Sequence, residues 1–197
     1  MWSSQIVAFI VAIIMWEKYK KSTQRNFLFF LGFVLIIEAL GYFVPKFYNV
    51  KAYFVYNIYI IVAGYFYLYW LKNINKTKAL GLLSITIFSV ALFYFIIFED
   101  FFKLWKALFI LLSILIAIHS FLFYSKLLSQ NEVVKYQDNQ KFWIVTGTLI
   151  FFINYVPLTL LQKPLDIPSI YFRIFILVLN LIMYGFYIMS FLCLKEK

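Results

Sequence analysis

Long apolar segments follow one another along almost the whole chain, and they constrain the fold more than any other feature. A helix that spans a bilayer needs about 20 mostly apolar residues, with a range of about 17–25. The chain is 65% hydrophobic, whereas a soluble domain is about 45–50% apolar. A soluble fold of this length has too little interior to bury so much apolar surface. The sequence therefore predicts an integral membrane protein.

Seven apolar segments predict an all-α, polytopic membrane protein in which residues 1–197 form a single transmembrane domain. The connections are short, and no Gly/Ser-rich or Pro-rich linker divides the chain. Six segments are long enough to span a bilayer, and the first is short. The expected helices are 2–16, 27–45, 53–71, 79–98, 104–125, 142–162 and 169–194.

Lysine and arginine are distributed unevenly between the two sets of connections, which predicts the orientation. One side carries twelve of them: Lys18, Lys20, Lys21, Arg25, Lys72, Lys76, Lys78, Lys126, Lys135, Lys141, Lys195 and Lys197. The other side carries six: Lys46, Lys51, Lys103, Lys106, Lys163 and Arg173. The excess places the C-terminus in the cytoplasm, and with seven helices the N-terminus is outside. We expect a multi-pass protein of the bacterial inner membrane. If the first segment does not span, only the N-terminus changes sides.

The formal net charge of +10 does not indicate a nucleic-acid partner. The lysines lie in short connections between apolar segments, where they act as topology signals and contact lipid headgroups. The expected surroundings are therefore the lipid bilayer and no nucleic acid.

One carboxylate, Glu38, lies well inside an apolar segment, and no other acidic residue lies so deep. A carboxylate at such a depth costs about 2.5–3.5 kcal/mol on insertion scales, which makes it a candidate functional residue. Gly41 and Tyr42 follow it on the same helix face. The glycine would let a neighbouring helix approach closely, and the tyrosine could donate to the carboxylate.

Other polar residues fall at a similar depth in the third, sixth and seventh segments, and together they predict an outward-facing ligand pocket. Pro157 lies one turn from Asn154 and could open a cavity by kinking its helix. Each polar residue also has a structural interpretation, as a hydrogen bond between helices, an interfacial tyrosine or a snorkelling arginine. The expected ligand-binding residues are Glu38, Tyr42, Tyr56, Asn57, Asn154, Arg173, Asn180 and Tyr184.

Several kinds of site lack the residues that they require. His119 and Cys193 are the only residues of their types, so neither a disulfide within the chain nor a usual zinc site is expected. Residues 174–194 contain no lysine for a retinal Schiff base. No nucleophile elbow, Walker loop or HExxH motif occurs. We therefore expect no metal and no cofactor.

Three short motifs carry a resemblance to known sequences: Glu38 with Gly41, the run Tyr56 to Tyr59, and the run Phe142 to Gly147. They resemble a group of small, uncharacterised integral membrane proteins of Bacteroidetes with about seven helices. The resemblance covers most of the chain and implies the fold and compartment, without an activity. Members of the group often carry a second Glu where this chain has Val62-Ala63-Gly64, which argues against a mechanism with two carboxylates.

Three functions fit these features. The first is a receptor or sensor-like module that binds a small or lipid-like ligand around Glu38 and signals to a protein partner on the cytoplasmic side. The second is a small transporter or proton-coupled carrier in which Glu38 titrates. The third is an intramembrane lipid enzyme, which is disfavoured because a nucleophile and metal ligands are missing. The sequence names no catalytic residue.

Overall fold

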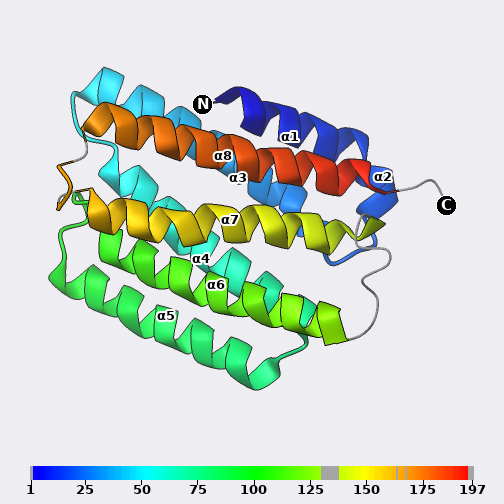
Figure 1. Cartoon of the computed structure of the whole chain (residues 1–197). Helices are drawn as coiled ribbons and strands as arrows, with labels where there is room; N and C mark the ends of the chain where they lie inside the picture. The colour runs from blue at the N-terminus through cyan, green and yellow to red at the C-terminus, as the bar shows by residue number, and fades with distance from the viewer. Residues whose placement is uncertain (1, 130–137, 163, 167, 195–197) are drawn as a thin grey trace.

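The computed structural model describes residues 2–129, 138–162, 164–166 and 168–194, and the regular elements in these ranges are all α-helices. This confirms the all-α prediction. Figure 1 shows the helices lying side by side, with the connections gathered at the two ends of the bundle. The helices are α1 (Trp2–Ile14), α2 (Trp16–Tyr19), α3 (Asn26–Tyr48), α4 (Tyr53–Asn75), α5 (Lys78–Phe98), α6 (Lys106–Ser129), α7 (Gln140–Leu161) and α8 (Ser169–Leu192).

Six helices, α3 to α8, are each long and apolar enough to cross a membrane. Their bounds follow the predicted segments to within a few residues at most ends. At its C-terminal end α3 extends about one turn beyond the predicted segment, because the helix continues through Pro45 to Tyr48. Asn49 then ends it in the left-handed conformation, with its backbone N–H donating to the Pro45 carbonyl over 3.1 Å. An asparagine is well suited to such a cap.

The first predicted segment forms a shorter helix than the others. Helix α1 has 13 residues and is followed, after a break at Met15, by the four-residue α2. At 1.5 Å per residue α1 is about 20 Å long. It begins near the middle of the length of α8 and runs to the end of the bundle where the C-terminus lies (Figure 1). The last half of α1 is anchored there, since the Tyr19 hydroxyl donates to the Ala12 carbonyl over 2.8 Å.

The helices form a closed ring with one helix outside it. Going round the ring, α1 packs on α3, α3 on α4, α4 on α6, α6 on α7, α7 on α8, and α8 on α1. Helix α5 lies outside the ring against α4 and α6, at the edge of the bundle in Figure 1. Because α1 is about half as long as its two neighbours in the ring, it separates α3 from α8 over only part of their length.

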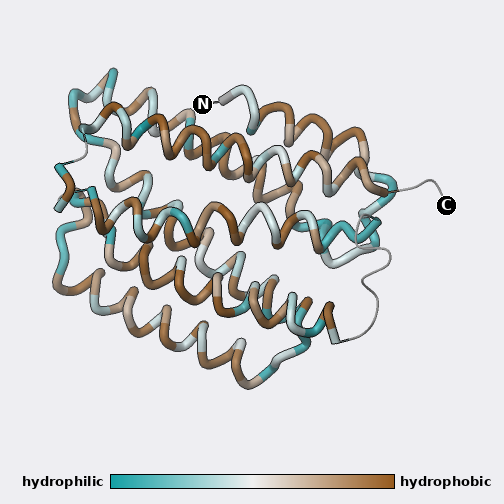
Figure 2. The backbone as a smooth tube through the Cα atoms, in the orientation of Figure 1, coloured by the Kyte–Doolittle hydropathy of each residue, from teal (hydrophilic) through white to brown (hydrophobic). Residues whose placement is uncertain are grey.

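Aromatic rings fill the centre of the ring toward the lysine-rich end. The ring of Phe27 meets those of Phe66 and Trp70 edge-on, both at centroid distances of 4.9 Å, and that of Tyr187 at 5.7 Å. Phe152 is also fully buried there and contacts Tyr67. Large apolar side chains cover the outside of the bundle, and Figure 2 shows hydrophilic residues gathered mainly at its two ends. This distribution is the one expected of a multi-pass protein in a lipid bilayer.

The closest backbone approach that the structure shows at a glycine lies between α7 and α8. A Cβ placed on Gly147 would lie 2.7 Å from Phe186 Cβ and 3.0 Å from the Met183 carbonyl oxygen. Neither atom is the flexible tip of a side chain. By contrast, a Cβ on Gly185 would meet nothing within 4 Å.

We therefore expect Gly147→Ala to destabilise the protein by about 1–3 kcal/mol, the usual cost of overpacking. Thermal unfolding of the purified protein in detergent should begin several degrees lower than in the wild type. Gly185→Ala is the matched control and should leave the unfolding temperature unchanged or raise it, because alanine favours a helix over glycine. Equal unfolding temperatures for the two variants would contradict the close α7–α8 contact.

Candidate functional site

Glu38 lies at the middle of α3, with about as many helical residues before it as after it. Because α3 extends to Tyr48, the carboxylate is about 15 Å from the C-terminal end of its helix. The side chain is partly buried. Its Oε1 accepts a hydrogen bond from Gln5 Nε2 over 3.2 Å, and Gln5 itself is 2% exposed. The first turn of α1 therefore reaches Glu38 because α1 begins at mid-depth.

Three tyrosines from two other helices surround this contact. Tyr56 and Tyr59 of α4 and Tyr184 of α8 all lie within electrostatic range of the Glu38 carboxylate. The Tyr184 hydroxyl also lies within hydrogen-bonding reach of the Gln5 side chain. Tyr184 is 2% exposed, whereas Tyr56 and Tyr59 keep some accessible surface. Three helices, α1, α4 and α8, thus place polar side chains around the carboxylate of α3.

Gly41 explains how Tyr56 comes so close to α3. A Cβ on this glycine would lie 2.8 Å from the Tyr56 hydroxyl oxygen and 3.1 Å from the adjoining ring carbon. The tyrosine ring therefore lies directly over the glycine, one turn from Glu38. The sequence predicted that a neighbouring helix approaches closely at Gly41. The structure shows such an approach by the Tyr56 side chain of α4, which positions a phenol at the site.

A second group of hydroxyls continues from the site toward the lysine-rich end. The hydroxyls of Tyr67 and Tyr187 are 2.8 Å apart, and that of Tyr187 is 2.9 Å from Thr148 Oγ1. Thr148 in turn donates to the Ile144 carbonyl over 2.8 Å. All three side chains are fully buried. Tyr59 lies within electrostatic range of Tyr187, so these hydroxyls extend the polar region that begins at Glu38.

Two buried oxygens near the start of α1 have no hydrogen-bond partner in the described part of the chain. They are Gln5 Oε1 and Ser4 Oγ, both in the first turn of α1. A buried polar atom without a partner costs about 1–3 kcal/mol, so native proteins seldom leave one without a reason. Gln5 Oε1 belongs to the amide that contacts the Glu38 carboxylate, so a group bound there could donate to it.

The structure brings together Glu38, Tyr56 and Tyr184 of the predicted site residues, with Asn180 one turn from Tyr184 on the same helix. Asn180 is 8% exposed. Its amide donates to the carbonyl of Ile176 within its own helix over 2.8 Å. It therefore lies at the edge of the cluster without binding any other member.

Three predicted site residues lie away from the cluster. Tyr42 is 54% exposed, and the Lys46 ammonium lies 5.9 Å from its ring centroid at the outer end of α3. Asn154 faces outward and donates to the Ile150 carbonyl of its own helix over 2.8 Å. Arg173 is exposed in the first turns of α8, about 10 Å along the helix axis from Asn180. Arg173 therefore does not pair with Glu38.

Asn57 is fully buried, and it holds a loop instead of facing Glu38. Its amide nitrogen donates to the carbonyls of Phe101 and Lys103 over 2.9 and 2.8 Å, and its amide oxygen accepts from the Trp105 backbone N–H over 3.1 Å. These bonds delay the start of α6 to Lys106, two residues later than predicted. They use both amide protons and the carbonyl oxygen, which gives Asn57 a structural role.

Sequence reasoning missed Gln5, Tyr59, Tyr67 and Thr148 as members of the polar region. Gln5 looked interfacial because it stands near the end of a short segment. The three others look like ordinary packing residues in a chain with 16 tyrosines. The spacing of Tyr184 and Tyr187, three residues apart on one face of α8, is the signal that could have placed Tyr187 there.

The residues that the structure describes contain no group of three His, Cys, Asp or Glu side chains that could hold a metal ion. His119 is fully buried in α6, and its Nε2 lies 3.0 Å from Ser84 Oγ of α5. Its carbonyl accepts from the Asn75 amide over 2.8 Å. These contacts join α4, α5 and α6. They lie away from the contact between α1 and α3 at Glu38.

No protein-family model, curated protein or solved structure matches the chain. The chemistry of the site must therefore be argued from the residues that surround Glu38.

The two asparagines predicted to bind ligand should differ sharply when they are replaced. Asn57→Ala would leave two carbonyls and one N–H of the loop without partners, at about 1–3 kcal/mol for each group that water cannot reach. We expect unfolding several degrees lower than in the wild type and faster proteolysis between Glu99 and Trp105. Asn154→Ala should change the unfolding temperature by no more than about one degree, because its amide bonds only to its own helix. Equal losses in the two variants would refute the loop-holding role of Asn57.

Proposed function

We propose that the protein is a receptor-like membrane module that binds a small or lipid-like ligand at Glu38. The observation that carries this proposal is a carboxylate at the middle of a membrane-spanning helix, surrounded by polar side chains from α1, α4 and α8. A carboxylate in a membrane is costly and commonly marks a functional site. Among the described residues Glu38 forms no ion pair, so none of their cations neutralises it directly.

The shortness of α1 supports access from the outer side. Helix α1 begins at the level of Glu38 and runs toward the lysine-rich end, so on the other side of that level α3 and α8 have no helix of the ring between them. Glu38, Tyr56 and Tyr59 all keep accessible surface at this level. Toward the lysine-rich end, by contrast, the ring is closed by Phe27, Tyr67 and their neighbours. A ligand would therefore enter from the outer half of the bilayer and stop at Glu38.

The chemistry of the site favours a ligand whose head donates hydrogen bonds, above all an amine. Glu38 and Gln5 Oε1 are acceptors, and tyrosine hydroxyls can accept as well as donate. An ammonium group would form a charge-assisted bond with the carboxylate, which is about twice as strong as a neutral one. The surrounding apolar side chains suit a ligand with a hydrocarbon body. The signal would pass to a protein partner on the lysine-rich, cytoplasmic side.

A homologous pair of probes tests this proposal directly. An n-alkylamine, kept below its micelle-forming concentration, should raise the thermal unfolding temperature of the purified protein, because a ligand that binds only the folded state stabilises it. The n-alkanol of the same chain length should do so at least about tenfold less effectively. Glu38→Gln should abolish the difference between the two probes.

The control for this experiment is Glu99→Gln, which removes an exposed carboxylate at the outer end of α5. It should respond to the amine as the wild type does. If amine and alcohol act equally on the wild type, or if Glu38→Gln keeps the preference for the amine, the proposal is wrong.

The second candidate is a proton-coupled carrier, and the buried hydroxyls favour it. From Glu38 the polar region continues through Tyr59 to Tyr187, Tyr67 and Thr148 in the half of the bundle that aromatic side chains otherwise fill. Hydrogen-bonded hydroxyls can pass protons through a region that excludes other solutes. In this case Glu38 would bind and release a proton during each cycle.

Proton movement into proteoliposomes would distinguish the carrier. With a potassium diffusion potential and an internal pH-sensitive dye, a carrier should acidify the lumen faster than empty liposomes do. Glu38→Gln should remove this flux, and Tyr187→Phe should reduce it several-fold by removing the hydroxyl that joins Tyr67 to Thr148. A wild-type rate equal to that of empty liposomes would exclude the carrier and leave the binding module.

We further propose a seven-segment topology in which α1 spans only about half of the bundle, with the N-terminus directed outward and the C-terminus inside the bacterial inner membrane. The two-to-one excess of lysine and arginine on one side supports this orientation. The resemblance to small membrane proteins of Bacteroidetes also remains a prediction.

Thiol labelling of intact cells checks the orientation. In a Cys193→Ser background, Val50→Cys in the α3–α4 connection should react with a membrane-impermeant maleimide. Ala79→Cys at the start of α5 should react only after the cells are opened. Both positions are exposed, so burial would not explain a difference between them. The opposite labelling pattern would reverse the proposed topology.

A further inference from the structure

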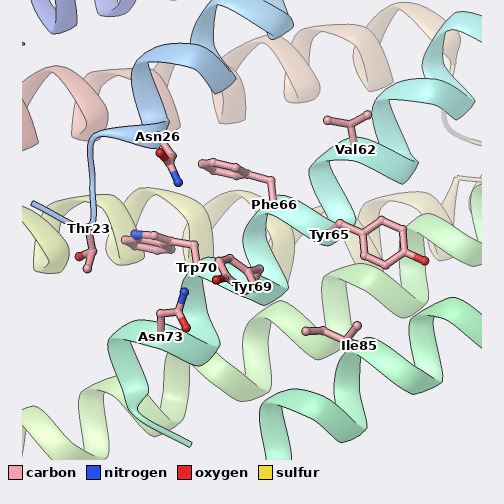
Figure 3. Close-up of a pocket in the computed structure, with 9 residues that line it drawn as sticks. All are labelled: Thr23, Asn26, Val62, Tyr65, Phe66, Tyr69, Trp70, Asn73 and Ile85. Carbon is pink, nitrogen blue, oxygen red and sulfur yellow. The ribbon is translucent and has the colours of Figure 1, made fainter. Parts of the chain in front are cut away.

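A groove separate from the Glu38 site lies over α4, between α3 and α5. Both of these helices pack against α4, and the groove between them has a volume of about 470 Å³. This size is within the range of about 300–1,000 Å³ that is typical of ligand sites. Figure 3 shows the side chains that line it: Thr23, Asn26, Val62, Tyr65, Phe66, Tyr69, Trp70, Asn73 and Ile85.

The two ends of the groove differ in chemistry. Thr23, Asn26 and Asn73 place a hydroxyl and two amides at the end that lies near the α2–α3 and α4–α5 connections. In Figure 3 the amide nitrogens of Asn26 and Asn73 both point toward the indole of Trp70. Val62 and its apolar neighbours line the other end, and Val62 lies about 12 Å along α4 from Trp70. The groove is therefore polar at the membrane surface and apolar toward the membrane interior.

The indole N–H of Trp70 has no partner in the described part of the chain. Trp70 is 4% exposed, and its Nε1 is buried without a hydrogen bond. Tryptophan usually finds an acceptor for this N–H when it is buried, since leaving it unpaired costs about 1–3 kcal/mol. A donor without an acceptor, beside two further amide donors, indicates that the groove is suited to a ligand rich in acceptor oxygens.

The charge around the polar end is strongly positive. Segments 15–26 and 71–80, which flank this end, contain seven cations and one acid: Lys18, Lys20, Lys21, Arg25, Lys72, Lys76 and Lys78, with Glu17. The Lys72 ammonium lies 5.0 Å from the ring centroid of Tyr69, a lining residue, which places one charge at the rim of the groove. Basic residues at the membrane surface attract anionic lipid headgroups by about 1 kcal/mol each.

We propose that this groove binds an anionic phospholipid from the leaflet at the lysine-rich end. The phosphate accepts hydrogen bonds from Trp70, Asn26 and Asn73, with Lys72 contributing charge at the rim. One acyl chain lies along Val62, Phe66 and Ile85. A soluble anion would make no contact with the apolar side chains of the groove. An apolar partner helix would offer no acceptor to the N–H groups of Trp70, Asn26 and Asn73. A phospholipid satisfies both parts at once.

Native mass spectrometry of the whole protein, stripped of lipid in detergent, tests the proposal. The probes are phosphatidylglycerol and phosphatidylcholine with the same acyl chains. We expect the wild type to bind the anionic lipid about tenfold more tightly than the zwitterionic one. Trp70→Phe keeps the ring and removes the N–H, and it should weaken binding of phosphatidylglycerol about tenfold. Lys72→Gln should reduce the preference for the anionic lipid several-fold.

Two further variants make the result specific to the groove. Val62→Phe enlarges an exposed side chain at the apolar end and should weaken binding of both lipids. Trp143→Phe removes an indole N–H from α7, near the same end of the bundle but outside the groove, and should bind as the wild type does. Each variant is first compared with the wild type in thermal unfolding. If Trp70→Phe does not fold, Lys72→Gln and Val62→Phe decide the question.

Equal affinities of the wild type for the two lipids would overturn the proposal, because the contact would then be non-selective. An equal loss in Trp143→Phe and in the groove variants would overturn it too, because the site would then lie elsewhere.

Discussion

The hydrogen bond between Gln5 and Glu38 is the interaction on which the arrangement of the site depends. Lipid offers no partner to a carboxylate, so the protein must supply one or the side chain must lose its charge. Here the hydrogen-bond partner comes from α1. This helix is too short to extend past Glu38, so its polar first turn meets α3 at mid-depth. A longer apolar helix in this place would have presented hydrocarbon to the carboxylate. The shortness of α1 therefore accounts for the polar contact that Glu38 receives.

The polar residues of the membrane segments fall into two groups with different consequences. Asn154 and Asn180 bond to carbonyls of their own helices, which satisfies them without restricting any neighbour. Asn57 and the Tyr67–Tyr187–Thr148 hydroxyls bond between elements and therefore fix how those elements pack. Bonds of the second kind between membrane helices contribute about 0.6 kcal/mol each on average. They are too weak to drive association alone, but they select one packing among several of similar energy.

The bundle is asymmetric along its axis. Aromatic contacts around Phe27 close the lysine-rich half. In the opposite half α1 is absent from the ring. The Glu38 site faces the open half, and the lipid groove lies on the outside of the closed half. A ligand at Glu38 and a lipid over α4 would thus contact opposite ends of the same helix, since Tyr56 and Trp70 are both α4 residues. Helix α4 therefore lines both of the proposed sites.

The sequence by itself determined the class of protein, the six long helices and the position of Glu38 inside one of them. These follow from local properties: apolar length sets a membrane helix, and a lone carboxylate is costly wherever the bundle places it. The tertiary structure alone decided which polar groups reach that carboxylate. Asn57 and Asn154 were predicted to lie at a depth similar to that of Glu38, yet they lie elsewhere, because depth does not specify rotation about the helix axis or the order of helices in the ring. Gln5 and Tyr59 join the site for the same reason, through the packing of α1 and α4 on α3.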